Sequence, residues 1–559
     1  MRRVVSFSGA ALVAYLVLAF ALFSSAWTHP RGRWIGADFD PVLFIWYLRW
    51  LPFALAHDHN PLVSDYLNWP DGFHLMWNTS ILLPAFVLSP LTLLLGAVFA
   101  YNVLSTVALA LSAWCAYLVL RRYAGSTAAA VGGLLYGFSS FMFVEAANHP
   151  HLTLAVFPPL AWLLLDEIVV RQRRRPVPLG LLLGLLAASQ LLTGEEVLAM
   201  TAVVAAVGVV LLALLHRNEV RARAPYVARA LGPALLVGSL LAAYPLAHQT
   251  FGARNVFTTT SPVQNRGTYI LDALELVVPS QRQELTFGAA NRVASNFNGP
   301  SEIGGYVGVP LLVLALAVVL MWRRDTLVQF TGLLAAIVLL LALGPRANFA
   351  GHPLPVPLPW VVPQRLPLVQ SILPARFALL LFLLLAVLVA VFVDRARVRG
   401  PVLAAILVVA FVPLLPNLPF PSTSSASPTF FTSGADVLPS GDVALVAPVA
   451  SIRGGTTRAM LWQQQAGLRF RMPEGVVIAP RRRSRALVTL VHRLTAAEPR
   501  AAPWMRCTLV RSRVNWVLVG PMQRRTRTLA FFRAIFERAP RRAGGVAYWS
   551  VGGSGGGCA

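Results

Sequence analysis

The sequence contains no lysine and few charged residues of either sign. Of its 559 residues, 47 are basic, all of them arginine, 22 are acidic, and charged residues make up 12% of the chain. That share is about half of what soluble domains carry. Hydrophobic residues reach 57%, and apolar runs long enough to cross a bilayer as helices recur along most of the chain. The composition argues against a soluble protein and predicts a polytopic membrane protein.

Cysteine is also scarce, and several catalytic motifs are missing. Cys115 lies in an apolar run, and Cys507 and Cys558 lie near the carboxyl end, where a disulfide between them would require an extracytoplasmic tail. No cysteine pair has the spacing of a metal site. The sequence shows no zinc motif, no Ser/His/Asp triad and no phosphate-binding glycine loop. An ATPase of the Walker type is therefore excluded, and the energy for any reaction must come from the substrate.

The net charge of +25 would suggest a nucleic-acid partner in a soluble protein. Here the arginines gather in short loops between apolar runs, which the positive-inside rule explains without any ligand, so we predict no nucleic-acid partner. Five such loops are Arg121–Arg122, Arg171–Arg175, His216–Arg223, Arg323–Arg324 and Arg395–Arg399. They all face the cytoplasm only if the run Ile81–Ala97, broken by Pro84 and Pro90, lies along or dips into the outer face without crossing.

This topology gives about 11 transmembrane helices. They are expected near residues 5–27, 100–120, 126–144, 151–170, 177–194, 196–215, 228–248, 304–322, 327–344, 375–393 and 401–416. The first run is predicted to be an uncleaved span with a cytoplasmic amino terminus at the plasma membrane. A cleaved signal peptide is the alternative, but the run is long and no clean A-x-A site follows it.

The domain organisation follows from a shift in composition after residue 416. Residues 1–416 form the transmembrane domain, with a first outer loop at 28–99, and residues 417–430 form a Pro/Ser/Thr linker. Residues 431–551 are predicted to be a small extracytoplasmic α/β domain, followed by a disordered glycine-rich tail at 552–559. Its strands are expected at 442–448, 514–520 and 546–551, and helices at 457–466 and 529–538.

Two carboxylates, Asp38 and Asp40, lie just past the first apolar run in a stretch dense with aromatic residues and histidines. Aspartate at such a boundary often caps a helix or bonds to a loop. A carboxylate at the membrane surface is also suited to general-base work. We interpret the pair as catalytic and favour Asp40, while either residue remains a candidate for the base.

This arrangement resembles the GT-C superfamily of membrane glycosyltransferases. The likeness lies in a first span followed by an acidic outer loop, a hydrophobic helix beside the membrane and a returning span with arginines inside. Shorter stretches are similar to actinobacterial members: Asp40–Trp50, Asn60–Leu62, Trp77–Ser80, Met460–Gln463 and Arg469–Gly475. The resemblance implies a polyprenyl-phosphate-linked sugar donor and a glycan, lipid or protein acceptor on the outer face. It also implies that an aspartate of the first outer loop, here Asp38 or Asp40, is the general base.

Two arginines are candidates for binding the donor phosphate. Arg376 lies at the outer start of a predicted span, against the positive-inside trend, and a planar guanidinium suits a phosphate diester. Snorkelling to lipid headgroups is the alternative. Arg365 is a second candidate, on an amphipathic stretch suited to the polyprenyl chain.

Further polar residues lie in turns on the same predicted face. Glu145, His149 and His151 are expected to bind an acceptor hydroxyl or the donor phosphate, although solvated helix ends are an alternative. Their proximity also allows a divalent metal, but without tight ligand spacing, so no metal ligand and no firm cofactor are assigned. Glu195, beside Glu196, marks either a pathway at the bundle rim or a simple turn. Tyr306 is either a sugar-stacking residue or an ordinary interfacial tyrosine.

The sequence thus predicts an integral membrane glycosyltransferase. The alternatives are a transporter or flippase for a lipid-linked saccharide, and a non-catalytic scaffold for envelope assembly. A transporter should carry ionisable residues in mid-membrane or an internal repeat. Neither is visible, and the acidic residues gather at one predicted face.

The topology can be tested with reporter fusions. A reporter fused after Arg122 is expected to lie in the cytoplasm, and one fused after Pro421 outside it, because the basic loops agree only on this arrangement. Alkaline phosphatase and green fluorescent protein fusions would measure both positions. An external signal from the Arg122 fusion would refute the 11-span topology.

Overall fold

The structure, a computed structural model, describes residues 2–256, 269–297, 299, 302–366, 369–451, 456–479, 485–495, 501–502 and 504–552. Cys558 and the predicted tail beyond residue 552 lie outside these ranges. The chain forms two compact units. The helical unit comprises residues 1–28, 103–243 and 261–422, and the loop-and-sheet unit comprises residues 29–102, 244–260 and 423–559.

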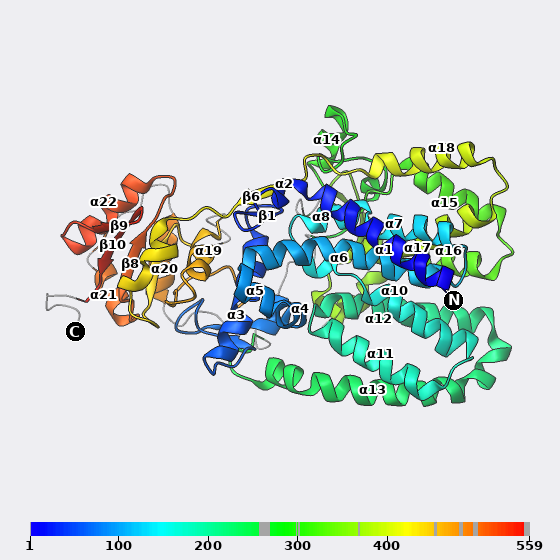
Figure 1. The fold of residues 1–559 in the computed structure, drawn as a ribbon, viewed down its shortest axis with the longest axis horizontal. Coiled ribbons are helices and arrows are strands. Elements are labelled where there is room, and N and C mark those ends of the chain that lie inside the picture. The colour runs from blue at the N-terminus through cyan, green and yellow to red at the C-terminus, as the bar shows by residue number, and fades with distance from the viewer. Residues whose placement is uncertain are drawn as a thin grey trace. The chain divides into compact units, whose positions relative to one another are not determined.

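Helices occupy all 11 positions at which the sequence predicts a span (Figure 1). They are α1 (Arg2–Leu22), α6 (Ala97–Leu120), α7 (Ser126–Gly137) with α8 (Ser140–Ala146), α9 (Pro150–Thr153) with α10 (Phe157–Leu165), α11 (Pro176–Leu191), α12 (Glu195–Leu215), α13 (Val220–Phe251), α15 (Val309–Met321), α16 (Thr326–Ala342), α17 (Ala378–Arg395) and α18 (Gly400–Phe411). Among the described residues, five helices are long and apolar enough to cross a membrane, or six if the bent pair α7–α8 counts as one span. Five more apolar helices are shorter. The presence of helices is therefore confirmed, and the number of crossings stays a prediction.

The centre of the helical unit is α17. Its residues Ala378–Phe392 are all buried, which fits a sequence that is apolar around the whole circumference of the helix. Helices α7, α15 and α16 pack against it. Gly132 of α7 permits the closest approach, because a Cβ atom there would lie 2.8 Å from the carbonyl oxygen of Ala386. The fixed position of α17 also fixes η8 (Pro374–Phe377), the turn that precedes it and carries Arg376.

The run Ile81–Ala97 is not one helix. It forms two short helices, α4 (Leu82–Val87) and α5 (Ser89–Leu95), which meet at Leu88. Neither is long enough to cross a bilayer, since a span needs about 20 residues. That the run lies along or dips into the outer face without crossing stays a prediction.

The carboxyl-terminal part of the loop-and-sheet unit contains a four-stranded sheet in the order β7-β8-β10-β9 (Figure 1). Its strands are β7 (Ala444–Ala447), β8 (Trp516–Val519), β9 (Arg541–Ala543) and β10 (Val546–Ser550). β7 runs parallel to β8, and β10 runs antiparallel to both β8 and β9. Residues of α20 (Arg485–Thr495), α21 (Trp504–Arg511) and α22 (Arg525–Phe536) share a hydrophobic core with the sheet. The three expected strands are present, as are the expected helices at α19 (Arg458–Gln465) and α22, while the boundaries of an independent domain at 431–551 remain a prediction.

Buried hydrogen bonds join the first loop to this carboxyl-terminal part. The indole Nε1 of Trp46, on α3 (Asp40–Ala56), donates to Oε1 of Gln463 at 2.7 Å. Nε2 of Gln463 donates to the carbonyl oxygens of Tyr66 and Phe470, both at 2.8 Å. The backbone N–H of Met472 donates to the carbonyl of Tyr66 at 2.9 Å. Stretches from opposite ends of the sequence that carry the GT-C resemblance therefore contact one another.

Candidate functional site

Asp40 occupies the first turn of α3, with Pro41 immediately after it. Proline suits this position, because the first helical N–H groups lack acceptors and the fixed φ of proline already matches the helix. The side chain of Asp40 is half-buried, and an acidic residue in the first turn interacts favourably with the helix dipole. The local sequence therefore places the carboxylate at the start of a largely buried helix.

Asp38 has a different environment. Its Oδ2 accepts a hydrogen bond from Nη2 of Arg458 at 2.8 Å, and the carboxylate is largely exposed. The Arg458 guanidinium also donates to the carbonyl of Ser424 and lies 5.3 Å from the ring centroid of Trp34. Asp38 is thus engaged in holding Arg458 and the loop together.

The buried face of α3 is aromatic. Trp46 and Trp50 stack with their ring centroids 5.4 Å apart, and Trp50 donates to the carbonyl of Pro61. Burial, and then the negative charge of Asp40, raise the pKa of the Tyr47 phenol well above its ordinary value. Tyr47 therefore stays neutral beside the Asp40 carboxylate.

In the helical unit, Arg376 is buried in an acidic cluster. Its Nε donates to Oε2 of Glu302 at 2.8 Å, and its Nη2 pairs with the other oxygen of the same carboxylate. Its Nη1 pairs with Glu196, whose second oxygen accepts from the backbone N–H of Leu373 at 2.7 Å. The guanidinium is thus fixed by a fork-like pair on one side and a single carboxylate on the other.

Glu145 adds a third carboxylate to the surroundings of Arg376. Its Oε2 lies 2.6 Å from Nδ1 of His149, one helical turn further along. The rings of His149 and His151 are 5.7 Å apart. The Oε1 atom of Glu145 is buried and, among the described residues, has no hydrogen-bond partner. A buried acceptor of this kind suits a hydroxyl group of a ligand.

The turn that carries Glu302 is held by its two glycines. A Cβ atom on Gly304 would lie 3.1 Å from Cα of Phe141, and one on Gly305 would lie 3.0 Å from Oε1 of Glu275. The backbone N–H of Gly305 instead donates to that Glu275 oxygen at 2.7 Å. Both glycines therefore permit close packing of this turn.

Not all predicted residues join these clusters. Arg365 is exposed in η6 (Pro363–Arg365), Tyr306 is buried, and Glu195 opens α12 beside the residue that pairs with Arg376. From the sequence, no role was assigned to Glu302 or Arg458. For Glu302, the nearby pair Gly304–Gly305 was a signal that could have identified it. Among the residues that the structure describes, no group of three or more histidine, cysteine or acidic side chains is placed to hold a metal ion.

One protein-family model matches most of the sequence. Residues 11–414 match the family described as "Domain of unknown function (DUF6311)". The chain belongs to the DUF6311 family. Among curated proteins, no relative of this DUF6311 protein is found.

Solved structures of other proteins resemble the fold of the DUF6311 protein. The cryo-EM structure of the arabinofuranosyltransferase AftD from Mycobacteria matches 99% of this chain at 17% identity, with a TM-score of 0.56. The R1389S mutant of AftD in its class 2 gives 16% identity and a TM-score of 0.59. The chain spans about two fifths of AftD, 40% and 42% in the two cases. The oligosaccharyltransferase AglB from Archaeoglobus fulgidus, in complex with an inhibitory peptide and a dolichol-phosphate, matches 92% of this chain and 69% of its own at 13% identity and a TM-score of 0.47. The likeness to AftD confirms the predicted GT-C fold.

The pairing of Arg376 predicts a large effect of its removal. Arg376→Leu leaves two buried carboxylates without their cation, and breaking a buried pair in this way typically costs about 3–5 kcal/mol. The triple variant Arg376→Leu with Glu196→Gln and Glu302→Gln removes the charges together and is expected to regain most of the stability. Thermal unfolding in detergent measures both, and equal melting temperatures for wild type and the single variant would contradict the pairing.

Glu275 predicts a dependence of stability on pH. Burial raises the pKa of this carboxyl to about 8, from an ordinary value of 4.5. The folded protein then binds one more proton than the unfolded chain between these values, so stability is full below pH 4.5 and falls as the pH rises to 8, by up to about 1.4 kcal/mol per pH unit. Glu275→Gln should flatten the dependence of the melting temperature on pH over this window, because the variant has no carboxyl group there to titrate.

Proposed function

We propose that this DUF6311 protein is an integral membrane glycosyltransferase. It transfers a sugar from a polyprenyl-phosphate-linked donor to a glycan, lipid or protein acceptor on the extracytoplasmic side of the plasma membrane. The observation that carries the proposal is the likeness to AftD, which extends over 99% of the chain. The 11-span topology, with the amino terminus in the cytoplasm and residues 431–551 outside, belongs to the same proposal.

Asp40 is the proposed general base. It removes the proton from an acceptor hydroxyl as the oxygen attacks the anomeric carbon of the donor. The bond between that carbon and the phosphate oxygen breaks, polyprenyl phosphate leaves, and the configuration at the carbon inverts. The ion pair between Asp38 and Arg458 supports Asp40 over Asp38, because it gives the Asp38 carboxylate a structural role in holding Arg458.

The buried cluster of the helical unit is proposed to bind substrate. Oε1 of Glu145 fits a hydroxyl donor, and His149 and His151 lie next to it. Arg376 stays the candidate for the donor phosphate, with the condition that a phosphate must compete with Glu196 and Glu302 for the guanidinium. If Arg376 binds phosphate, the triple variant described above should be stable and yet bind the donor weakly. If Arg376 serves only to neutralise Glu196 and Glu302, the triple variant should keep donor binding. Arg365, Glu195 and Tyr306 remain weaker candidates for the lipid chain and the sugar.

Asp40→Asn is expected to lower transfer by a factor of about 10²–10⁴ while melting temperature and donor binding stay nearly unchanged. The change keeps the size of the side chain and removes the proton acceptor. Purified protein would be offered several polyprenyl-phosphate sugars, and sugar transfer or donor hydrolysis would be read by mass spectrometry. Asp38→Asn should have a smaller effect.

Asp58→Asn is the matched control. Asp58 lies in the exposed loop after α3 with a φ of 54°, a conformation that asparagine tolerates well. It should keep full activity. Full transfer by both Asp38→Asn and Asp40→Asn with a verified donor would refute the assignment of the base. Movement of a lipid-linked sugar between leaflets without any turnover would favour a flippase.

A further inference from the structure

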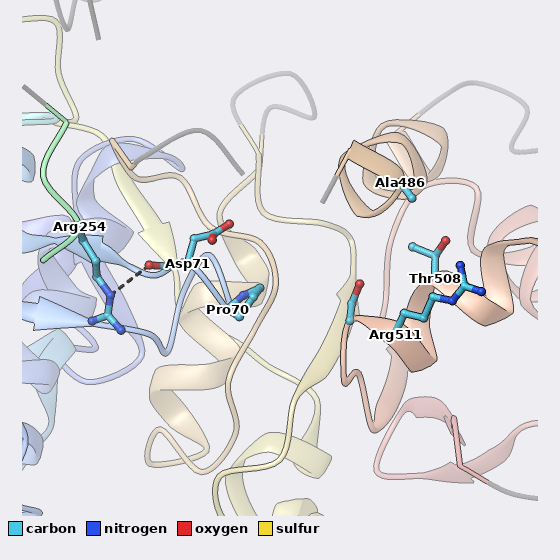
Figure 2. A pocket seen from close by; sticks show the side chains of 7 residues that line it. Pro70, Asp71, Arg254, Ala486, Thr508 and Arg511 are labelled. Carbon is cyan, nitrogen blue, oxygen red and sulfur yellow. Dashed lines mark hydrogen bonds between the residues drawn. The ribbon is translucent and has the colours of Figure 1, made fainter. Parts of the chain in front are cut away.

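A cavity of about 450 Å³ lies in the loop-and-sheet unit. The described residues that line it all lie outside α3. Its lining comes from Pro70, Asp71, Arg254, Ala486, Thr508, Arg511 and Ser512. The volume falls within the range of small-molecule sites. Figure 2 shows Arg254, Asp71 and Pro70 on one side of the view, and Ala486 of α20 with Thr508 and Arg511 of α21 on the other. Four stretches of the chain, at 70–71, 254, 486 and 508–512, therefore line one cavity.

The lining combines donors for an anion with an acceptor for hydroxyl groups. Arg254 and Arg511 bring two guanidinium groups, and Thr508 and Ser512 bring two hydroxyls. The Asp71 side chain supplies a carboxylate, and its carbonyl accepts from Nε of Arg254 at 3.1 Å. Among the described residues this is the one hydrogen bond of the Arg254 guanidinium, so its terminal nitrogens keep donors for a ligand. None of the described residues that line the cavity is aromatic.

The backbone at Arg254 is unusual. Its φ of 66° lies in the left-handed region, which side chains other than glycine, asparagine and aspartate rarely adopt. Gly72 beside it has a φ of 64°, and a Cβ atom there would clash with the carbonyl oxygen of Ser64 and lie 2.6 Å from Nε of Arg254, so the local backbone requires glycine and the guanidinium packs against it. Residues held in sparsely populated backbone conformations, as Arg254 is, cluster at functional sites.

The charge of the surrounding chain points in the same direction. Residues 423–559 contain 20 arginines and five acidic residues. The positive-inside rule concerns short loops between spans, and the described part of this segment contains no helix that could cross a membrane. A basic surface outside the membrane attracts polyanions over distances set by the ionic strength.

We propose that this cavity binds an acidic saccharide, that is, a sugar unit bearing a carboxylate or phosphate group. Arg254 and Arg511 bind anionic groups of the ligand from the two sides of the cavity, the Ser512 hydroxyl donates to these groups or to the ring oxygens, and the Asp71 carboxylate accepts from sugar hydroxyls. The Thr508 hydroxyl already donates to the carbonyl of Trp504 at 3.0 Å. The mixture of donors with one acceptor favours a saccharide over a simple anion. This site goes beyond the proposed function and does not rest on it, because binding here requires neither a donor nor turnover.

The test measures binding by calorimetry to the full-length protein in detergent. The probes are a tetrasaccharide containing glucuronate, the same tetrasaccharide with its carboxylates reduced to alcohols, inorganic phosphate, and vesicles containing phosphatidylglycerol. The charged tetrasaccharide is expected to bind at least tenfold more tightly than the reduced form, because charge-assisted hydrogen bonds are the strong ones. Phosphate alone is expected to bind more weakly than the charged tetrasaccharide.

Three variants locate the site. Arg511→Gln and the double variant Arg254→Gln with Arg511→Gln should weaken binding by about tenfold or more, and Ala486→Trp should block the cavity while keeping every arginine. Arg533→Gln removes the same charge from an exposed position on α22 outside the cavity, and should change affinity less than twofold. Melting temperatures verify folding. If the double variant does not fold, the two single variants Arg511→Gln and Ala486→Trp are enough to locate the site.

Several results would overturn the proposal. Equal affinity for the charged and reduced tetrasaccharides would exclude an anion site. An equal loss with Arg533→Gln would show general charge attraction without a built site. Binding to vesicles but not to the tetrasaccharide would assign the basic surface to lipid. Loss of transfer by Asp40→Asn leaves these measurements unchanged, so the two proposals fail separately.

Discussion

The apolar circumference of α17 is the constraint on which the helical unit depends. A helix with fifteen consecutive buried residues must be surrounded on all sides, and this dictates that α7, α15 and α16 pack around it. The turn at its start is then held in a fixed place, and the guanidinium of Arg376 becomes buried with it. A buried cation requires counter-charges, which Glu196 and Glu302 supply. Packing thus comes first, and the polar cluster is arranged around what packing has buried.

Buried polar contacts join the parts of the loop-and-sheet unit. A single glutamine, Gln463, bonds to an indole and two carbonyls, and each of these groups is buried. Glu474 has a similar role, since its Oε1 accepts from the backbone of Val446 in the sheet while its carbonyl accepts from Asn68 in the first loop. Such contacts are directional. They hold α3, and with it Asp40, in one orientation relative to the carboxyl-terminal sheet of the same unit.

The sequence predicted helices and strands well where one local property decides them. Apolar length located the helices, and short runs rich in β-branched residues located β7, β8 and β10. The pairing of Glu145 with His149 was within reach, because four residues on a helix make one turn. The partners of Arg376 were not, since Glu196 and Glu302 lie 180 and 74 residues away and no local pattern joins them. The same holds for Asp38 and Arg458, which are 420 residues apart.

The contact between Asn78 and Ile478 has a consequence for biosynthesis. The amide of Asn78 donates to the carbonyl of Ile478 and accepts from its N–H, across 400 residues of chain. At about 5–20 residues per second, roughly 20–80 seconds pass between the synthesis of the two partners. During that time the first loop has left the ribosome without the segment that completes it. Its aromatic surface is then exposed to chaperones, proteases and other nascent chains, so the efficiency of assembly depends on how fast the later half of the protein is made.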